Sequence, residues 1–276
     1  MKYNYLSVRV NSQQKPSFFT GPTLRGTLGH VLKEKVCISP AYDCSTCLYQ
    51  KECLYYEYYE SSAGYRALRL DVRLEAKNYD FGFYFFGDTQ VILRTMIQSV
   101  RDMLQTGTIS DKKLSFPQSE IFLNGEKLFF SEKGMLKPFK FSPQSLIISK
   151  YHRNVTIKFL TPCLIKEYGK LKKEISLEDV LLSIYKRKTY FESKAIVRKL
   201  NYIPSYTLAS SHLHKVTTNR KSDRQNKAIT LEGVTGDMHI ENLDPESYSL
   251  LRYGEILSVG NKTVFGYGII KLINKI

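Results

Sequence analysis

The stretch Gly254-Glu-Ile-Leu-Ser-Val-Gly-Asn-Lys-Thr-Val-Phe-Gly-Tyr-Gly268 decides the fold, because it joins a helical pattern to the closing strand. It differs from a phosphate-binding P-loop, since five residues separate its first two glycines and Asn261 lies between Gly260 and Lys262. It also leads from a helix to a strand, the reverse of the P-loop order. We interpret it as a glycine-lined turn that presents Lys262 beside exposed amides, with a purely structural tight turn as the alternative.

Outward from this turn, helical and strand periodicities alternate in an order that occurs twice. The second half predicts a strand at 154–160, a helix at 176–201 opened by a Ser-Leu-Glu-Asp cap, strands at 213–220 and 234–240, a helix at 245–257 opened by Asp244, and a strand at 263–273. The first half predicts a strand at 5–10, a helix around 24–32, strands at 67–74 and 79–86, a helix at 90–104, and strands at 120–123 and 127–130.

Each half therefore has the order β-α-β-β-α-β. We expect an α+β protein of two tandem ferredoxin-like domains, 1–145 and 146–276, with a Pro- and Phe-containing connector at 137–143 between them.

The charge of the chain indicates a polyanionic partner. It holds 41 Lys and Arg against 26 Asp and Glu, a formal net charge of +15, and 13% of its residues are aromatic. Residues 186–227 carry eleven basic residues against only Glu192 and Asp223. Cations that meet phosphates and rings that stack on bases suit nucleic acid, although most of the rings fill strands. No apolar run of about 18 residues occurs, and the first residues lack a signal-peptide core, so we expect a cytoplasmic protein with no membrane partner.

Four of the five cysteines, Cys37, Cys44, Cys47 and Cys53, directly follow the first predicted helix. In a cytoplasmic chain, a Cys-x6-Cys-x2-Cys-x5-Cys spacing favours metal ligation by thiolates over disulfides. We predict a structural Zn²⁺ site in a Cys-rich loop at 37–53, inserted after that helix. An iron–sulfur cluster, redox chemistry and unliganded thiols are the alternatives. Cys163 lies in an apolar strand and is interpreted as a small core residue.

Six segments carry a family resemblance. They are Gly21-Pro-Thr-Leu-Arg-Gly-Thr-Leu-Gly-His30, Leu160-Thr-Pro-Cys-Leu-Ile165, Arg220-Lys-Ser-Asp-Arg224, Gly233-Val-Thr-Gly236, Leu250-Leu-Arg-Tyr-Gly-Glu-Ile-Leu257 and Val259-Gly-Asn-Lys-Thr-Val-Phe-Gly-Tyr-Gly268. They resemble CRISPR-associated RAMP proteins, and more closely the endoribonuclease subfamily that processes CRISPR precursor RNA. The resemblance implies two ferredoxin-like domains, binding of CRISPR repeat RNA, and RNA cleavage that requires no metal ion or other cofactor. It also implies a catalytic His in the first helix.

His30 is the candidate catalytic residue. At 100° per residue, the apolar positions of its helix share roughly one 100° arc, and His30 lies on the opposite side with Gly26 and Lys33. Imidazole, with an ordinary pKa of ~6.5, can take a proton from a ribose 2′-OH or give one to the leaving 5′ oxygen. Lys33 would stabilise the transition state. The expected products are 2′,3′-cyclic phosphate and 5′-OH ends. DNA, which lacks the 2′-OH, would bind without being cut.

The other histidines are weaker candidates. His212 and His214 flank the basic stretch on one face of a predicted strand and are held in reserve, whereas His152 and His239 have no comparable context. No Tyr lies at a matching spacing to serve as a partner of His30. The candidate RNA contacts are Arg25, Lys35, Arg187, Arg220, Lys221, Arg224, Lys227, Gly260, Lys262, Gly266 and Gly268.

Two other functions stay open. A non-catalytic RNA-binding RAMP subunit of a CRISPR effector complex would share the fold and the charge, and its histidines would be incidental. A zinc-ribbon module that binds duplex DNA is a weaker alternative, because no predicted helix offers a clear reading face for the major groove.

Overall fold

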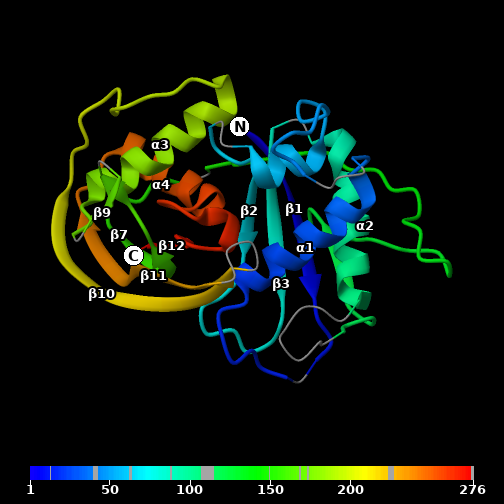
Figure 1. Ribbon diagram of the computed structural model, residues 1–276. Helices are drawn as coiled ribbons and strands as arrows, with labels where there is room; N and C mark the ends of the chain where they lie inside the picture. Colours follow the sequence, from blue (N-terminus) through cyan, green and yellow to red (C-terminus); the bar gives the residue numbers. More distant parts are fainter. Residues whose placement is uncertain are drawn as a thin grey trace. The chain divides into compact units, whose positions relative to one another are not determined.

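The computed structural model describes residues 1–12, 14–39, 43–61, 64–87, 89–106, 115–148, 150–167, 169–172, 174–222 and 227–274. The chain divides into two compact units, Lys2–Gln144 and Ser145–Ile276, the second of which includes Met1 (Figure 1). Each unit is described by itself. None of the helices within the described ranges has the length and apolar character that a membrane span needs.

The N-terminal unit contains one β-α-β-β-α-β series. In chain order its elements are β1 (Lys2–Arg9), α1 (Gly21–Val36), β2 (Leu68–Asp71), β3 (Phe81–Phe86), α2 (Gln90–Thr106) and β4 (Glu120–Leu123). The strands pair in the antiparallel order β2-β3-β1-β4, which a short β5 (Glu126–Lys127) extends. Additional elements are the π-helical turn η1 (Tyr56–Glu60) and β6 (Gln144–Ser145) at the unit boundary. The series is that of a ferredoxin-like domain, as predicted.

Burial and turn chemistry explain the sheet of this unit. On β3, Phe83 and Phe85 are fully buried, so this strand supplies much of the core. Strands β4 and β5 are joined by Asn124 and Gly125, which both have positive φ, the conformation that two-residue hairpin turns require. The predicted strand at 127–130 is shorter than expected, because regular pairing ends after Lys127.

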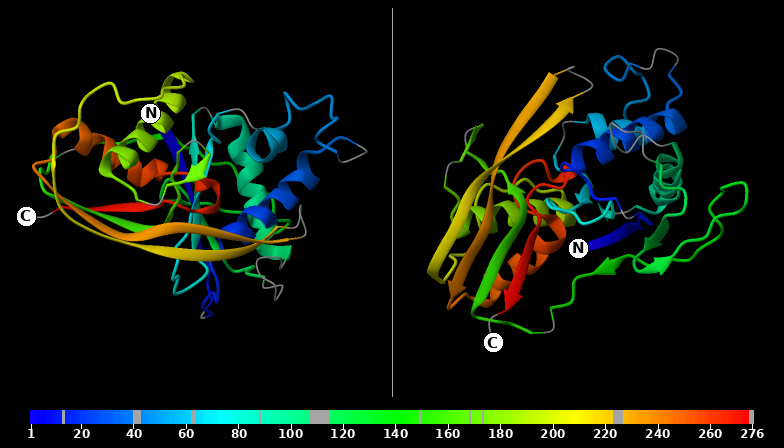
Figure 2. Two further views of the ribbon diagram at one scale, coloured as in Figure 1. Left: turned by 60° about the vertical axis from the view of Figure 1, so that its left-hand side comes forward. Right: turned by 90° about the horizontal axis from the view of Figure 1, so that it is seen from below.

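The C-terminal unit repeats the same topology. Its elements are β7 (Val155–Cys163), α3 (Leu177–Ser193), β10 (Thr207–Ser222), β11 (Lys227–Glu241), α4 (Pro245–Leu257) and β12 (Ile270–Asn274). The antiparallel order β10-β11-β7-β12 corresponds strand for strand to β2-β3-β1-β4. Helices α3 and α4 lie on the same side of this sheet (Figure 2). A small hairpin of β8 (Lys166–Glu167) and β9 (Lys170–Leu171) precedes α3.

The two helices of this unit begin where the sequence predicts. Ser176 and Asp179 form a capping box at α3, because the Ser176 Oγ accepts from the Asp179 amide and the Asp179 carboxylate accepts from the Ser176 amide. At α4, Asp244 Oδ1 accepts from the Ser247 amide at 2.8 Å. Helix α3 ends at Ser193, eight residues before the predicted end, because Lys194 adopts a left-handed conformation with φ of 59°.

Several strands of this unit differ in length from their predictions. Strands β10 and β11 pair from Thr207 to Glu241 and form a hairpin longer than the predicted 213–220 and 234–240, while β11 pairs with β7 only between Val234 and Ile240. The predicted strand at 263–273 begins with the 3-10 turn η2 (Thr263–Phe265), and β12 starts only at Ile270.

Candidate functional site

The predicted catalytic residue lies on the exposed side of α1. Leu24, Leu28 and Leu32 are at most 1% exposed and form the core face of the helix, whereas His30 is exposed. Gly26 lies one turn before His30, and a Cβ built on Gly26 would meet nothing within 4 Å. The helix therefore presents an imidazole beside open space, as its spacing predicts.

Another part of the α1 surface is covered by the turn η1. The guanidinium of Arg25 stacks over the Tyr59 ring at 4.2 Å and donates to the Tyr58 carbonyl at 3.2 Å. A Cβ on Gly29 would lie 2.6 Å from a Tyr59 ring carbon, so only glycine allows this close packing. Arg25 is 7% exposed. Its guanidinium is engaged in packing η1 against the helix, and its contact with RNA stays a prediction.

Lys33 and Lys35 have different surroundings. The Lys33 Nζ lies 5.3 Å from the centroid of the Tyr55 ring, a cation–π contact, and Lys33 follows His30 by about one turn. The Lys35 Nζ forms an ion pair with an Asp102 carboxylate oxygen at 2.5 Å. Lys33 is therefore the cation associated with the His30 side of the helix, and Lys35 is held by an acid on α2.

Tyr55 lies next to Lys33 and is not among the predicted site residues. Its ring stacks on Tyr59 with centroids 5.1 Å apart and planes at 3°. Burial raises the pKa of the Tyr55 phenol to about 12, with the nearby Glu60 carboxylate adding to the shift, so the hydroxyl keeps its proton. The i, i+4 spacing of the two tyrosines is the signal that could have indicated a shared helical face next to α1.

The four clustered cysteines are half-buried in the segment between α1 and η1. Within the part of the chain that the structure describes, no three of their sulfurs lie within 4.8 Å of one another. Four thiolates are a donor set that suits Zn²⁺, and closing a tetrahedral site requires this segment to contract around the ion. Burial raises the pKa of the Cys44 thiol, and the neighbouring Cys37 and Cys53 contribute in the same direction. Zinc binding stays a prediction.

The glycine-rich turn after α4 does not expose its glycines. Gly260, Gly266 and Gly268 are buried and have φ of 77°, 81° and 71°. Their amides donate within the unit: Gly260 to Ser183 Oγ at 2.7 Å, Gly266 to the Thr263 carbonyl, and Gly268 to the Pro162 carbonyl at 3.0 Å. The amides are therefore not exposed, which agrees with the tight-turn interpretation, and RNA contact by these glycines stays a prediction. Lys262 remains exposed at the tip.

Arg187 is part of the same turn rather than of a surface. It is 6% exposed and donates to Thr263 Oγ1 at 2.7 Å and to the carbonyls of Gly260 at 2.5 Å and Leu257 at 3.4 Å. The guanidinium holds the turn against α3, and its contact with RNA stays a prediction.

The remaining predicted contacts lie at the tip of the β10–β11 hairpin. Arg220, Lys221 and Lys227 lie on the two strands, but their side-chain positions fall outside the described part, as does Arg224 entirely. The reserve candidates His212 and His214 lie on one face of β10, as alternation predicts, opposite Asp237 and Thr235 of β11.

Comparisons with known proteins agree with this architecture. Residues 157–270 match the family model of the CRISPR-associated endoribonuclease Cas6, and residues 2–137 match a model described as an N-terminal domain. A Cas6 product complex has 12% identity to the chain and a TM-score of 0.54, with 99% of each chain covered. Cas6 of Thermus thermophilus has 11% identity and a TM-score of 0.51, covering 99% of this chain and 98% of its own. No curated protein matches the chain.

The α+β fold with tandem ferredoxin-like units is thus that of Cas6 structures, over essentially the whole chain. At 11–12% identity, the likeness to these structures is one of fold. Within the chain, the C-terminal unit carries the match to the Cas6 family model.

Proposed function

We propose that the protein is an endoribonuclease that binds CRISPR repeat RNA and cuts it during maturation of guide RNA in the cytoplasm. The observation that carries the proposal is the exposed His30 beside the open position at Gly26 on the first helix. The Cas6 family match of the C-terminal unit and the net charge of +15 support RNA as the substrate.

The proposed chemistry needs no metal ion. The His30 imidazole removes the proton of a ribose 2′-OH, whose oxygen attacks the adjacent phosphorus, or it protonates the leaving 5′ oxygen. The Lys33 ammonium supplies positive charge about one helical turn away while negative charge builds on the phosphoryl oxygens. Attack by the 2′ oxygen and departure of the 5′ oxygen leave a 2′,3′-cyclic phosphate and a 5′-OH end.

A second function has an observation in its favour. Among the described residues, no hydrogen-bond partner orients the His30 ring, whereas acid–base imidazoles are often held by a neighbouring group. A non-catalytic RAMP subunit that holds guide RNA in a CRISPR effector complex would not need such a partner. Under this alternative His30 is incidental and the fold and charge serve binding alone.

Single-turnover cleavage of the repeat RNA in EDTA separates the two functions. We expect wild type to cut, His30→Ala to lose about 100-fold or more in rate, and a 2′-deoxy substitution at the scissile nucleotide to abolish cutting. His152→Ala is the matched control, because it removes an imidazole from the C-terminal unit. Circular dichroism in the same buffer checks that chelation leaves the fold intact. Equal rates for His30→Ala and wild type exclude His30, and a wild type that binds but never cuts favours the binding subunit.

We also propose that Cys37, Cys44, Cys47 and Cys53 hold a structural Zn²⁺, with an iron–sulfur cluster as the alternative ligand. The donor set and its position directly after α1 support this assignment. The ion would fix the segment that leads into η1 and would take no part in the cleavage. Metal analysis of the purified chain, with and without the four cysteines changed to serine, distinguishes zinc, iron and no metal.

A further inference from the structure

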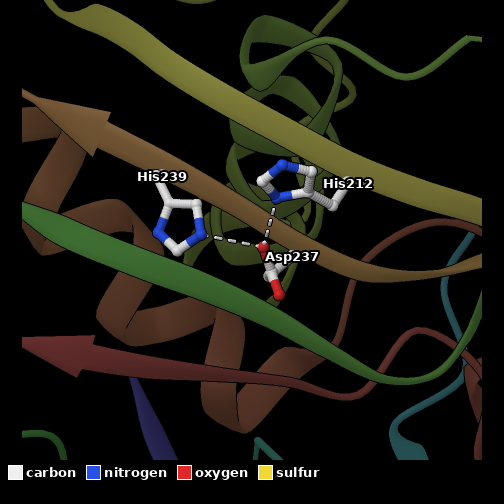
Figure 3. A group of neighbouring side chains, drawn as sticks. All are labelled: His212, Asp237 and His239. Atoms are coloured by element: carbon white, nitrogen blue, oxygen red, sulfur yellow. Dashed lines mark hydrogen bonds and ion pairs between the residues drawn. The ribbon is translucent and has the colours of Figure 1, made fainter.

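The register of the C-terminal sheet brings together three side chains that the cleavage chemistry does not use. His212 on β10 is paired with Asp237 on β11, and His239 follows Asp237 by two residues. Met238 and Ile240, which alternate with them, are each 1% exposed, so Asp237 and His239 point to the other face of the sheet. Figure 3 shows both imidazoles directed at the Asp237 carboxylate.

The distances within this cluster match those of a coordination sphere. Asp237 Oδ1 lies 3.2 Å from His212 Nδ1 and 3.0 Å from His239 Nε2, and the three ligand atoms all lie within 4.8 Å of one another. With metal–nitrogen and metal–oxygen bonds of about 2.0–2.2 Å, neighbouring ligand atoms of a tetrahedral zinc site are about 3.3 Å apart. The three atoms could therefore surround one ion with only small side-chain adjustments.

A neighbouring hydroxyl orients the His239 ring toward Asp237. Thr156 Oγ1 on β7 lies 2.8 Å from His239 Nδ1. With that nitrogen engaged by the hydroxyl, Nε2 is the atom directed at Asp237. Outer hydrogen bonds of this kind fix the tautomer and orientation of metal-binding imidazoles.

We propose that His212, Asp237 and His239 form a binding site for a late first-row divalent transition-metal ion, with Zn²⁺ as its representative. Two imidazoles and one carboxylate favour such ions over Mg²⁺ and Ca²⁺, which prefer oxygen ligands. The His212 side chain is 67% exposed, so a fourth position is open to water or to an anion. The ion would tie β10 to β11 near the base of their long hairpin. The site uses neither the four clustered cysteines nor His30, and it does not depend on the proposed cleavage.

One neighbouring charge opposes cation binding. Lys158 on β7 is paired with Asp237 in the register, and it is exposed. Its long side chain can direct the ammonium into solvent, which reduces the repulsion.

The test is Zn²⁺ titration of the full chain with histidines labelled for NMR, after chelation and buffer exchange near pH 7.5. The chain has five histidines, so each ring can be assigned by substitution. We expect the His212 and His239 ring signals to shift together, while those of His30, His152 and His214 stay in place. Zinc that binds only to the cysteines would leave the His212 and His239 ring signals unchanged, so the two sites can be distinguished.

Two variants make the result specific. Asp237→Asn keeps the shape of the cluster and removes the anionic ligand, and we expect the zinc concentration at half-shift to rise at least tenfold. His214→Ala is the matched control, because His214 lies two residues from His212 and its Nε2 bonds Thr235 Oγ1 at 3.0 Å, outside the cluster. Static His212 and His239 signals at excess zinc, or unchanged zinc binding by a folded Asp237→Asn, would overturn the proposal and leave an ordinary hydrogen-bonded triad.

Discussion

Helix α1 and the glycine-rich turn after α4 use the same residue type for opposite purposes. At Gly26, a built Cβ has open space around it, next to the exposed His30. At Gly268, a built Cβ would lie 1.8 Å from the Val259 carbonyl oxygen. Glycine therefore leaves room for a ligand in the first region and allows the backbone to close on itself in the second. Both regions carried predicted RNA contacts, and the exposed side chains among them are His30 on the helix and Lys262 at the tip of the turn.

The largest expected effect is at Gly268. Gly268→Ala forces a side chain into a left-handed conformation and against a main-chain oxygen, so we expect at least about 3 kcal/mol of destabilisation. Gly87→Ala is the matched control, since Gly87 has φ of 82° but nothing within 4 Å of a built Cβ, and it should cost only about 1–2 kcal/mol. Urea unfolding measures both. Equal costs would show that the tight turn tolerates a side chain.

A substitution at Arg187 tests whether its guanidinium hydrogen-bonds the turn or contacts RNA. Arg187→Met leaves Thr263 and two carbonyls without their buried donor, and we expect a loss of about 2–3 kcal/mol in the free energy of unfolding. Lys186→Met, at the preceding half-buried position of α3, should change stability little. If Arg187→Met instead kept full stability and weakened RNA binding in a filter-binding assay, the original interpretation of Arg187 would be restored.

A substitution at Gly26 tests whether RNA approaches the exposed surface of α1. Gly26→Ala should raise stability by up to about 1 kcal/mol, because alanine is the better helix former and its methyl group meets no atom. The same methyl group occupies space beside His30, so we expect single-turnover cleavage to fall by about tenfold. Gly29→Ala should instead destabilise the N-terminal unit, because its Cβ would lie 2.6 Å from the Tyr59 ring. Unchanged cleavage by Gly26→Ala would mean that RNA does not approach this face.

The smallest expected effect belongs to Lys262, the exposed tip of the otherwise buried turn. Lys262→Gln should leave thermal stability unchanged, weaken RNA binding by a small factor, and lower the slope of log Kd against log salt by about 0.7, the value for one phosphate contact on a single strand. Binding measured at several salt concentrations provides the slope. An unaltered slope would exclude the turn from the RNA interface altogether.

Local signals predicted most of the fold. Helix starts at Ser176 and Asp244 could be identified because a cap is made by residues three positions apart. The exposure of His30 followed from the angular spacing of its own helix. The end of α3 escaped prediction, because apolar residues such as Ile196 continue the helical pattern although the chain leaves the helix at Lys194 and Ile196 is 82% exposed.

The burial of two predicted site residues could not be predicted, because their partners lie far apart in the sequence. Arg25 and Arg187 look like surface cations in isolation, and their burial depends on Tyr59 and Thr263, which only the tertiary structure brings to them. His239 has no informative neighbour along the chain. Its relation to His212 comes from the strand register, which the alternation pattern of one strand does not determine.

The Arg187 guanidinium has a consequence for how the C-terminal unit responds to acid. It donates to the Leu257 carbonyl, the last residue of α4, and a guanidinium keeps its charge at every pH a protein experiences. The start of α4 differs. Burial alone would raise the pKa of Asp244, but hydrogen bonds from the Ser247 and Ser205 amides outweigh it and lower that pKa. This cap stabilises the folded state at pH values above the ordinary pKa of aspartate. The stabilisation is lost as the pH falls through the lowered pKa. Acid therefore weakens the Asp244 cap at the first turn of α4, while the hydrogen bond from Arg187 to the Leu257 carbonyl at its last turn is kept.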